Sequence, residues 1–172
     1  MAQSPDRRPE ASPISNDSGQ QSALSSLGHS VSFPVRFNEL DPYGHVNHAV
    51  YFSYMEFGRT EALNCCQLSL ADIATEGFQM VVTGIDAKFR LPAGAGDVVT
   101  VVTRIAQRKR ASAVWSQQVV RQGGDSGDRG DEVLLTASIV TAVTDLTGRP
   151  VKPPSWLFDR LAPLESDDGE AQ

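Results

Sequence analysis

The chain has 172 residues, a formal net charge of −6 and a hydrophobic share of 40%. Its length predicts one domain with a core of its own. Its negative charge, without a basic stripe, argues against nucleic acid as a partner. No run of 18 apolar residues is present, so the sequence predicts no membrane-spanning helix and no membrane partner.

The two ends of the chain differ in composition from its middle. Residues 1–28 are rich in Ser, Pro, Gln and Asp and lack the apolar segment of a secretion signal, which predicts a disordered tail. The acidic residues 165–172 predict a second disordered tail. We therefore expect one folded domain over residues 29–164, in a cytoplasmic protein.

Cysteine and histidine are few. The two cysteines, Cys65 and Cys66, are adjacent, a spacing that suits neither an ordinary disulfide nor a metal site, and we expect them at the end of a helix. His45 and His48 lie three residues apart but lack carboxylates at a metal-site spacing. The sequence therefore predicts no metal site.

The first strand is expected at residues 31–37. Apolar and polar side chains alternate there, which is typical of a half-buried strand. Pro34 has no backbone N–H to donate to a neighbouring strand, so this strand is expected at a sheet edge.

A helix is predicted after Asn47, whose side chain is suited to cap it. Between residues 49 and 63 the apolar side chains spread around most of the helix, and a helix that is apolar on most sides is a buried one. Gly58 costs about 1 kcal/mol relative to alanine, which is easier to accept where another backbone approaches closely. Glu56 and Arg59 are three residues apart and can form an ion pair.

Alternating and β-branched segments predict four further strands after this helix. A polar connection at residues 67–77 precedes them and has room for one short helical turn. Glycine and charged residues dominate 122–131, which predicts a long flexible hairpin loop. The strands are expected at residues 81–91, 98–106, 113–121 and 133–145, followed by a short helix at 154–161.

Short loops join the last four strands, and this predicts antiparallel pairing, because parallel pairing needs a longer crossover. A single helix that is apolar on most sides implies a sheet that curls around it. The predicted fold class is α+β, a five-stranded antiparallel sheet wrapped around one long central helix, with a short C-terminal helix. Such a sheet has two edges, and edge-to-edge pairing with a second copy covers one of them, so we expect a homodimer or a homotetramer.

One stretch of the chain resembles a known family. Residues 37–51 read Phe-Asn-Glu-Leu-Asp-Pro-Tyr-Gly-His-Val-Asn-His-Ala-Val-Tyr, and residues 54–61 read Tyr-Met-Glu-Phe-Gly-Arg-Thr-Glu. The pattern Asp-x-x-Gly-x-Val-x-x-x-x-Tyr with a later Glu-x-x-Arg resembles the signature of the 4-hydroxybenzoyl-CoA thioesterase family of hotdog-fold proteins. The resemblance covers most of residues 31–154. It implies a hotdog fold that dimerises into one continuous sheet, and the hydrolysis of an acyl-CoA thioester to free acid and CoA without a cofactor.

The resemblance implies two catalytic positions. Asp41 matches the catalytic carboxylate of the family, and the sequence leaves open whether it attacks the carbonyl directly or takes a proton from water. His48 matches the position whose backbone N–H holds the substrate carbonyl at the N-terminus of the helix. The first N–H groups of a helix lack intrahelical partners and lie at its positive end, and such a donor stabilises an oxyanion by about 3–4 kcal/mol.

Other residues of the motif carry two interpretations each. Gly44 is expected to serve the backbone, by a conformation or an approach that a Cβ would block. Tyr51 either lines the acyl pocket or packs in the core, and the His48 imidazole either contacts the substrate or takes no part. His45 and the Glu56–Arg59 pair are expected to be structural.

Coenzyme A carries phosphate groups, so cations are expected at the mouth of the substrate site. The alternative for each cation is an ordinary solvated surface position. The candidates are Lys88, Arg90, Lys109 and Arg110, with Arg108 beside the last two.

Other functions receive less support. The chain has no Gly-x-Ser-x-Gly elbow, no phosphate-binding loop and no dinucleotide fingerprint. Two alternatives to an acyl-CoA thioesterase remain: hydrolysis of the same bond on an acyl-carrier protein, and binding of acyl-CoA without catalysis. The aromatic residues of the motif do not identify the acyl group.

Overall fold

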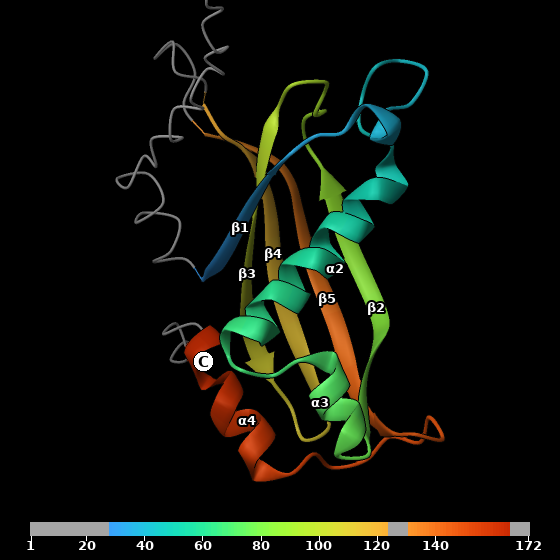
Figure 1. The fold of residues 1–172 in the computed structure, drawn as a ribbon, viewed down its shortest axis with the longest axis vertical. Helices are drawn as coiled ribbons and strands as arrows, with labels where there is room; N and C mark the ends of the chain where they lie inside the picture. Colours follow the sequence, from blue (N-terminus) through green and yellow to red (C-terminus); the bar gives the residue numbers. More distant parts are fainter. Residues whose placement is uncertain (1–27, 124–130, 166–172) are drawn as a thin grey trace, which may run out of the picture.

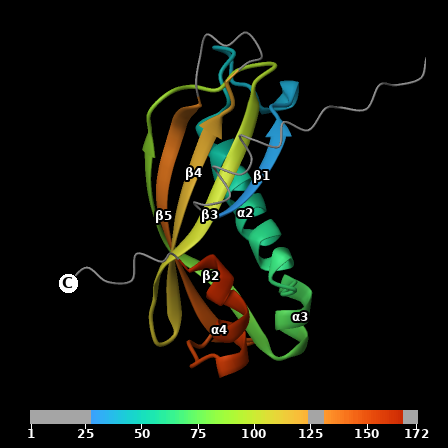
Figure 2. The same cartoon turned by 90° about the vertical axis from the view of Figure 1, so that its left-hand side faces the viewer.

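The computed structural model describes residues 28–123 and 131–165. Five antiparallel strands form one sheet in the order β1-β3-β4-β5-β2. One long helix, α2, lies against the sheet, and the sheet bends around it (Figures 1 and 2). The predicted α+β arrangement is therefore confirmed. The strands are β1 (His29–Pro34), β2 (Phe78–Phe89), β3 (Val98–Arg108), β4 (Ser112–Arg121) and β5 (Glu132–Asp145).

The first strand is shorter than predicted. It ends at Pro34, and residues 37–39 form the 3-10 turn η1 (Phe37–Glu39). The Glu39 carboxylate accepts a hydrogen bond from the Arg36 N–H at 2.7 Å, and this capping box turns the chain out of the sheet. As expected from Pro34, β1 is an edge strand, since β3 is its one partner among the described strands.

Helix α2 (His48–Cys65) begins where the sequence predicts it. The Asn47 side chain accepts a hydrogen bond from the Ala49 N–H at 2.9 Å and so caps the helix. Only one face of α2 is buried in the single chain, because Phe52 and Phe57 on the other face stay partly exposed. The expected burial on most sides is therefore incomplete. The buried residues are Tyr51, Tyr54, Met55, Gly58, Ala62 and Leu63.

At Gly58, helix α2 comes close to strand β3. A Cβ on this residue would lie 2.5 Å from Cγ1 of Val101 and 3.0 Å from Oγ1 of Thr103, both on β3. The close neighbour predicted for Gly58 is thus present, although side chains rather than a backbone occupy the space.

A buried polar side chain, Gln117 of β4, connects α2 to the sheet. Its Nε2 donates to the Met55 carbonyl at 2.9 Å and to the Thr103 hydroxyl at 2.8 Å. Its Oε1 accepts from Arg59 at 2.8 Å. Arg59 therefore binds the sheet as well as lying near Glu56, and burial lowers the pKa of its guanidinium.

Three short elements complete the described fold after the long helix. The helix α3 (Leu70–Thr75) fills the polar connection and starts at a capping box between Ser69 and Asp72. The helix α4 (Ser155–Leu161) and the 3-10 turn η2 (Ala162–Leu164) end the described chain. Figure 1 shows α3 and α4 at the end of the molecule opposite to the N-terminus of α2. Cys65 and Cys66 are free thiols at the C-terminal end of α2, as expected.

The two described chain ends meet on β3. A Cβ on Gly28 would lie 2.6 Å from the Thr103 carbonyl oxygen, and Glu165 forms a parallel bridge with Ile105. The remainder of the two predicted tails, residues 1–27 and 166–172, lies outside the described residues. The same holds for most of the predicted hairpin loop, residues 124–130. No helix in the described chain is both long enough and apolar enough to cross a membrane.

Candidate active site

The segment from Glu39 to Asn47 forms a closed loop, called here the Asp41 loop. Its two ends are joined, because the Glu39 carbonyl accepts a hydrogen bond from the Asn47 N–H at 2.9 Å. Inside it, the Asp41 N–H donates to the His45 carbonyl at 2.7 Å. The chain therefore folds back on itself and brings the Asp41 loop to the N-terminus of α2.

The two oxygens of the Asp41 carboxylate have different environments. Oδ1 accepts backbone N–H groups from Tyr43 at 2.9 Å and from His45 at 3.1 Å. Within the described chain Oδ2 accepts no hydrogen bond, and the residue is partly exposed. One oxygen thus supports the loop, while the other is available to a substrate or to water.

Gly44 permits the turn at the tip of this loop. Its φ of +79° lies in the left-handed region, and no atom lies within 4 Å of the position of a Cβ. The backbone role predicted for Gly44 is confirmed as a matter of conformation rather than of close approach. A contact between Gly44 and substrate stays a prediction.

The N-terminus of α2 leaves one backbone donor unpaired. Asn47 accepts the Ala49 N–H at its side chain and the Val50 N–H at its carbonyl, both at 2.9 Å. Across the residues that the structure describes, no acceptor is found for the N–H of His48, which is exposed. The helix thus presents a free N–H at its positive end.

A second turn, residues 92–97, supports the Asp41 loop from the side. The Val46 N–H donates to the Ala93 carbonyl at 2.8 Å, and the Ala93 N–H donates to the Tyr51 hydroxyl at 3.0 Å. Tyr51 is 3% exposed, and its ring packs edge-on against Phe89 at 5.6 Å. Burial is the main cause of the raised pKa of Tyr51. In the single chain Tyr51 belongs to the core, and its contact with an acyl group stays a prediction.

Two structural features around the candidate site were not predicted. Glu39, two residues before Asp41, accepts a hydrogen bond from the Tyr54 hydroxyl at 2.6 Å. Its position inside the family motif, at residues 37–51, was the sequence signal that could have pointed to Glu39. Arg121 holds the 92–97 turn by binding Asp97 at 3.1 Å and Glu132 through two nitrogens. No local pattern announces this network, because its members come from separate parts of the chain.

The predicted CoA-binding cations are not brought together in one chain. Lys109 and Arg110 follow β3, whose 11 residues span about 35 Å. The Asp41 loop lies at the opposite end of that strand, where His45 forms a bridge with Gly94. Arg90 follows β2 and lies four residues before Gly94, so it is on the side of the Asp41 loop.

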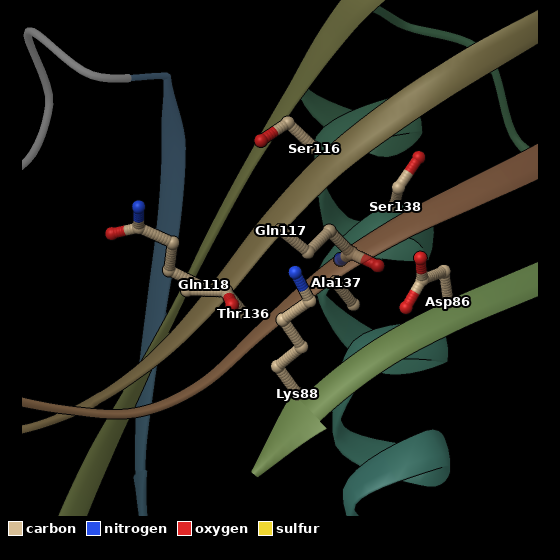
Figure 3. Close-up of a pocket in the computed structure, with 8 residues that line it drawn as sticks. All are labelled: Asp86, Lys88, Ser116, Gln117, Gln118, Thr136, Ala137 and Ser138. Atoms are coloured by element: carbon tan, nitrogen blue, oxygen red, sulfur yellow. The ribbon is translucent and has the colours of Figure 1, made fainter. Parts of the chain in front are cut away.

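Lys88 faces away from α2. Phe89 packs against Tyr51 on the helix side of the sheet, and neighbouring strand residues point to opposite faces. Lys88 therefore lies on the outer face, in a shallow polar pocket that Figure 3 views with α2 behind the strands. The residues that line this pocket are Asp86, Lys88, Ser116, Gln117, Gln118, Thr136, Ala137 and Ser138.

Comparison with known proteins identifies the family. The model of the thioesterase superfamily matches residues 43–128. The chloroplastic acyl-acyl carrier protein thioesterase ATL3 of Arabidopsis thaliana is 30% identical over 141 residues, which are 81% of this chain and 71% of ATL3. The long-chain acyl-CoA thioesterase FadM of Escherichia coli K12 is 31% identical over 85 residues, which are 49% of this chain and 64% of FadM.

A solved 4-hydroxybenzoyl-CoA thioesterase, in complex with 4-hydroxybenzoyl-CoA, shares the fold with a TM-score of 0.68. It covers 77% of this chain and 99% of its own, at 20% identity. That identity supports the hotdog fold alone, so the 4-hydroxybenzoyl-CoA branch expected from the motif is not shown. The family itself is shown by the matched superfamily model and by ATL3. The chain belongs to the thioesterase superfamily and is a thioester hydrolase with the hotdog fold.

Proposed function

We propose that the chain hydrolyses an acyl-CoA thioester to the free acid and CoA, with Asp41 and the His48 N–H as its catalytic groups. The observation that carries this proposal is the unpaired His48 N–H beside a loop whose carboxylate keeps one oxygen available. The Glu39–Asn47 hydrogen bond holds the two parts of the site together.

In the general-base route, Oδ2 of Asp41 takes a proton from water while the water oxygen attacks the thioester carbon. In the nucleophilic route, Oδ2 attacks that carbon itself, the thiolate of CoA leaves, and water then hydrolyses the resulting anhydride. In both routes the carbonyl oxygen becomes negative and accepts a hydrogen bond from the His48 N–H before the C–S bond breaks. In the first route the thiolate takes up the proton that Asp41 removed from water. In the second route it takes up a proton released when water hydrolyses the anhydride. The overall reaction consumes one water and needs no cofactor.

The His48 N–H suits the oxyanion for two reasons. It has no competing acceptor in the described chain, and it lies at the helix end that carries about half a positive charge. A donor in this position stabilises a developing oxyanion by about 3–4 kcal/mol. Whether the His48 imidazole also contacts the substrate is a separate part of the proposal.

Arg90 is the predicted cation that we place at the CoA phosphates, because it lies on the side of the Asp41 loop. Lys109 and Arg110 can reach that end only from a second copy of the chain, and Lys88 only around the sheet edge. We accordingly propose that the enzyme is a homo-oligomer. The edge strand β2 supports this, because Val82, Ile85 and Phe89 expose 45%, 46% and 50% of their surfaces. The cytoplasmic location expected from the sequence stays a prediction.

An acyl-carrier protein is the alternative carrier. It is favoured by the similarity to ATL3, whose name describes an acyl-acyl carrier protein thioesterase. Comparing turnover of one acyl group on CoA and on an acyl-carrier protein separates the two. A kcat/KM that is higher on the carrier protein would replace CoA in the proposal.

The proposal is tested by thiol release from a panel of acyl-CoA thioesters, with wild type and Asp41→Asn. Asparagine keeps Oδ1, which accepts the two backbone N–H groups, so the loop is expected to stay folded. Loss of the carboxylate should lower kcat by about 10²–10⁴-fold. Circular dichroism checks the fold of the variant. Retained turnover in a folded Asp41→Asn variant would show that Asp41 is only a turn former.

A further inference from the structure

Glu39 is a second carboxylate in the Asp41 loop, and it is largely buried. Its side chain is 12% exposed. Oε2 accepts two short hydrogen bonds, from the Tyr54 hydroxyl at 2.6 Å and from the Arg36 N–H at 2.7 Å. Oε1 lies 3.5 Å from the Arg36 guanidinium. These partners leave Glu39 poorly placed to attack a substrate or to take a proton from water.

The backbone of Glu39 makes a further contact with the site. Its carbonyl accepts the N–H of Asn47, the residue that caps α2. Glu39 thus links the Asp41 loop to α2 twice: at Asn47 through its backbone and at Tyr54 through its side chain. Tyr54 is 4% exposed and lies on the buried face of α2, so the second link reaches the core.

The Tyr54 side chain is itself packed between two aromatic rings. Its ring packs edge-on against Phe33 of β1 at 4.9 Å and against Tyr51 at 5.8 Å. Burial and the Glu39 carboxylate raise the pKa of Tyr54, so the phenol keeps its proton and remains a donor at any ordinary pH. A donor fixed by β1 and α2 therefore fixes the carboxylate two residues before Asp41.

We propose that Glu39 and Tyr54 form a positioning pair that sets the distance and direction between the Asp41 carboxylate and the His48 N–H. Neither residue reacts with the substrate. The inference rests on the proposed thioesterase mechanism, and it assigns to this chain two residues on which the rate of that mechanism depends. A misplacement of about 1 Å between reacting groups lowers an enzymatic rate by about 100-fold, so a positioning pair has a large effect on kcat.

The test uses four variants, Tyr54→Phe, Glu39→Ala, Glu39→Gln and the double variant Glu39→Ala/Tyr54→Phe. Tyr54→Phe and Glu39→Ala each break the link and should lower kcat by about 10–100-fold, with KM nearly unchanged. The double variant should be no slower than the slower single variant, because both remove the same link. Additive losses would overturn the pairing.

Glu39→Gln separates positioning from chemistry. The amide oxygen of glutamine accepts the same Tyr54 hydroxyl and Arg36 N–H, so this variant should keep most of the wild-type kcat. A kcat as low as that of Glu39→Ala would mean that the charge of Glu39 takes part in the reaction. That result would overturn the assignment of Glu39 as a positioning residue.

The matched control is Thr141→Val, in which another buried hydrogen bond is lost far from the site. The Thr141 hydroxyl accepts from the Trp115 Nε1–H at 2.9 Å, near the α4 end of the sheet. This variant should lose stability in urea unfolding but keep its kcat per folded molecule. An equal loss of kcat in Thr141→Val would show that kcat merely follows stability, against the proposal.

The two proposals fail in different ways. If the wild-type enzyme releases no thiol from any thioester, the proposed function is wrong. If the wild type is active and Asp41→Asn is inactive, while Tyr54→Phe and Glu39→Ala match the wild type, the positioning pair alone is wrong.

Discussion

Individual residues of the Asp41 loop contribute through conformation as well as contact. Asp41 stabilises the loop that carries it, since Oδ1 accepts two N–H groups from the next four residues. To test the catalytic role of Asp41 separately from its role in the loop, a substitution must remove the charge and keep the hydrogen-bond acceptor. Asparagine meets that requirement, whereas alanine would change loop and chemistry together.

Gly44 determines the conformation at the tip of the Asp41 loop. Its φ is +79° and its surroundings are open, so Gly44→Ala should cost about 1–2 kcal/mol from conformation alone. Gly44→Asn should cost less, because asparagine visits the left-handed region more readily. Urea unfolding of both variants measures the difference. Equal losses for alanine and asparagine would count against a conformational origin.

Helix α2 and strand β4 are joined by a polar contact inside the core. Gln117 satisfies the Met55 carbonyl, the Thr103 hydroxyl and the Arg59 guanidinium at once. Its removal leaves buried polar groups without partners, which costs more than the loss of apolar contact of similar size.

We therefore expect Gln117→Leu to lower the free energy of unfolding by about 2–3 kcal/mol. Its neighbour on the same strand, Gln118, faces the outer pocket of Figure 3 and is the matched control. Gln118→Leu should change stability by less than about 0.5 kcal/mol. Urea unfolding measures both, and similar losses would show that the buried network has no special weight.

The elements were predictable because their signals are local. Alternating side chains and the Asn47 cap place the strands and α2 within a few residues. The first strand was predicted too long, because the Glu39 capping box that ends it involves a side chain rather than a periodic pattern. The role of Gln117 was not predictable, since it depends on where α2 crosses β4.

The candidate site was predictable only in part. Its assignment to Asp41 and His48 came from resemblance to a family and stays a prediction. The grouping of the cations depends on which end of each strand lies near the loop, and on any second copy. The sequence shows neither, so Arg90 and Lys109 were equal candidates for binding the CoA phosphates. In the structure they lie at opposite ends of the sheet, and strand β3 spans about 35 Å between these ends.

The whole molecule presents one long apolar edge. Strand β2 has 12 residues, and in the described sheet its one partner is β5. Exposed apolar side chains on a long edge strand favour pairing with another chain.

We expect the protein to be at least dimeric in solution, and Ile85→Lys to be monomeric, because a charge on the helix side of β2 opposes edge pairing. Size-exclusion chromatography with light scattering measures the mass. Leu146→Lys, at another exposed apolar position, is the control and should keep the wild-type mass. A monomeric wild type, or a dimeric Ile85→Lys, would rule out pairing through β2.

The meeting of the described chain ends on β3 has a consequence for how the fold can be connected. Gly28 lies against Thr103 and Glu165 forms a bridge with Ile105, and one residue separates these two positions on β3. In a variant without residues 1–27 and 166–172, a short covalent link between these two positions closes the described chain into a ring without crossing the Asp41 loop. The same fold can therefore form from a chain whose elements follow one another in a different order. Circular permutation is compatible with this enzyme.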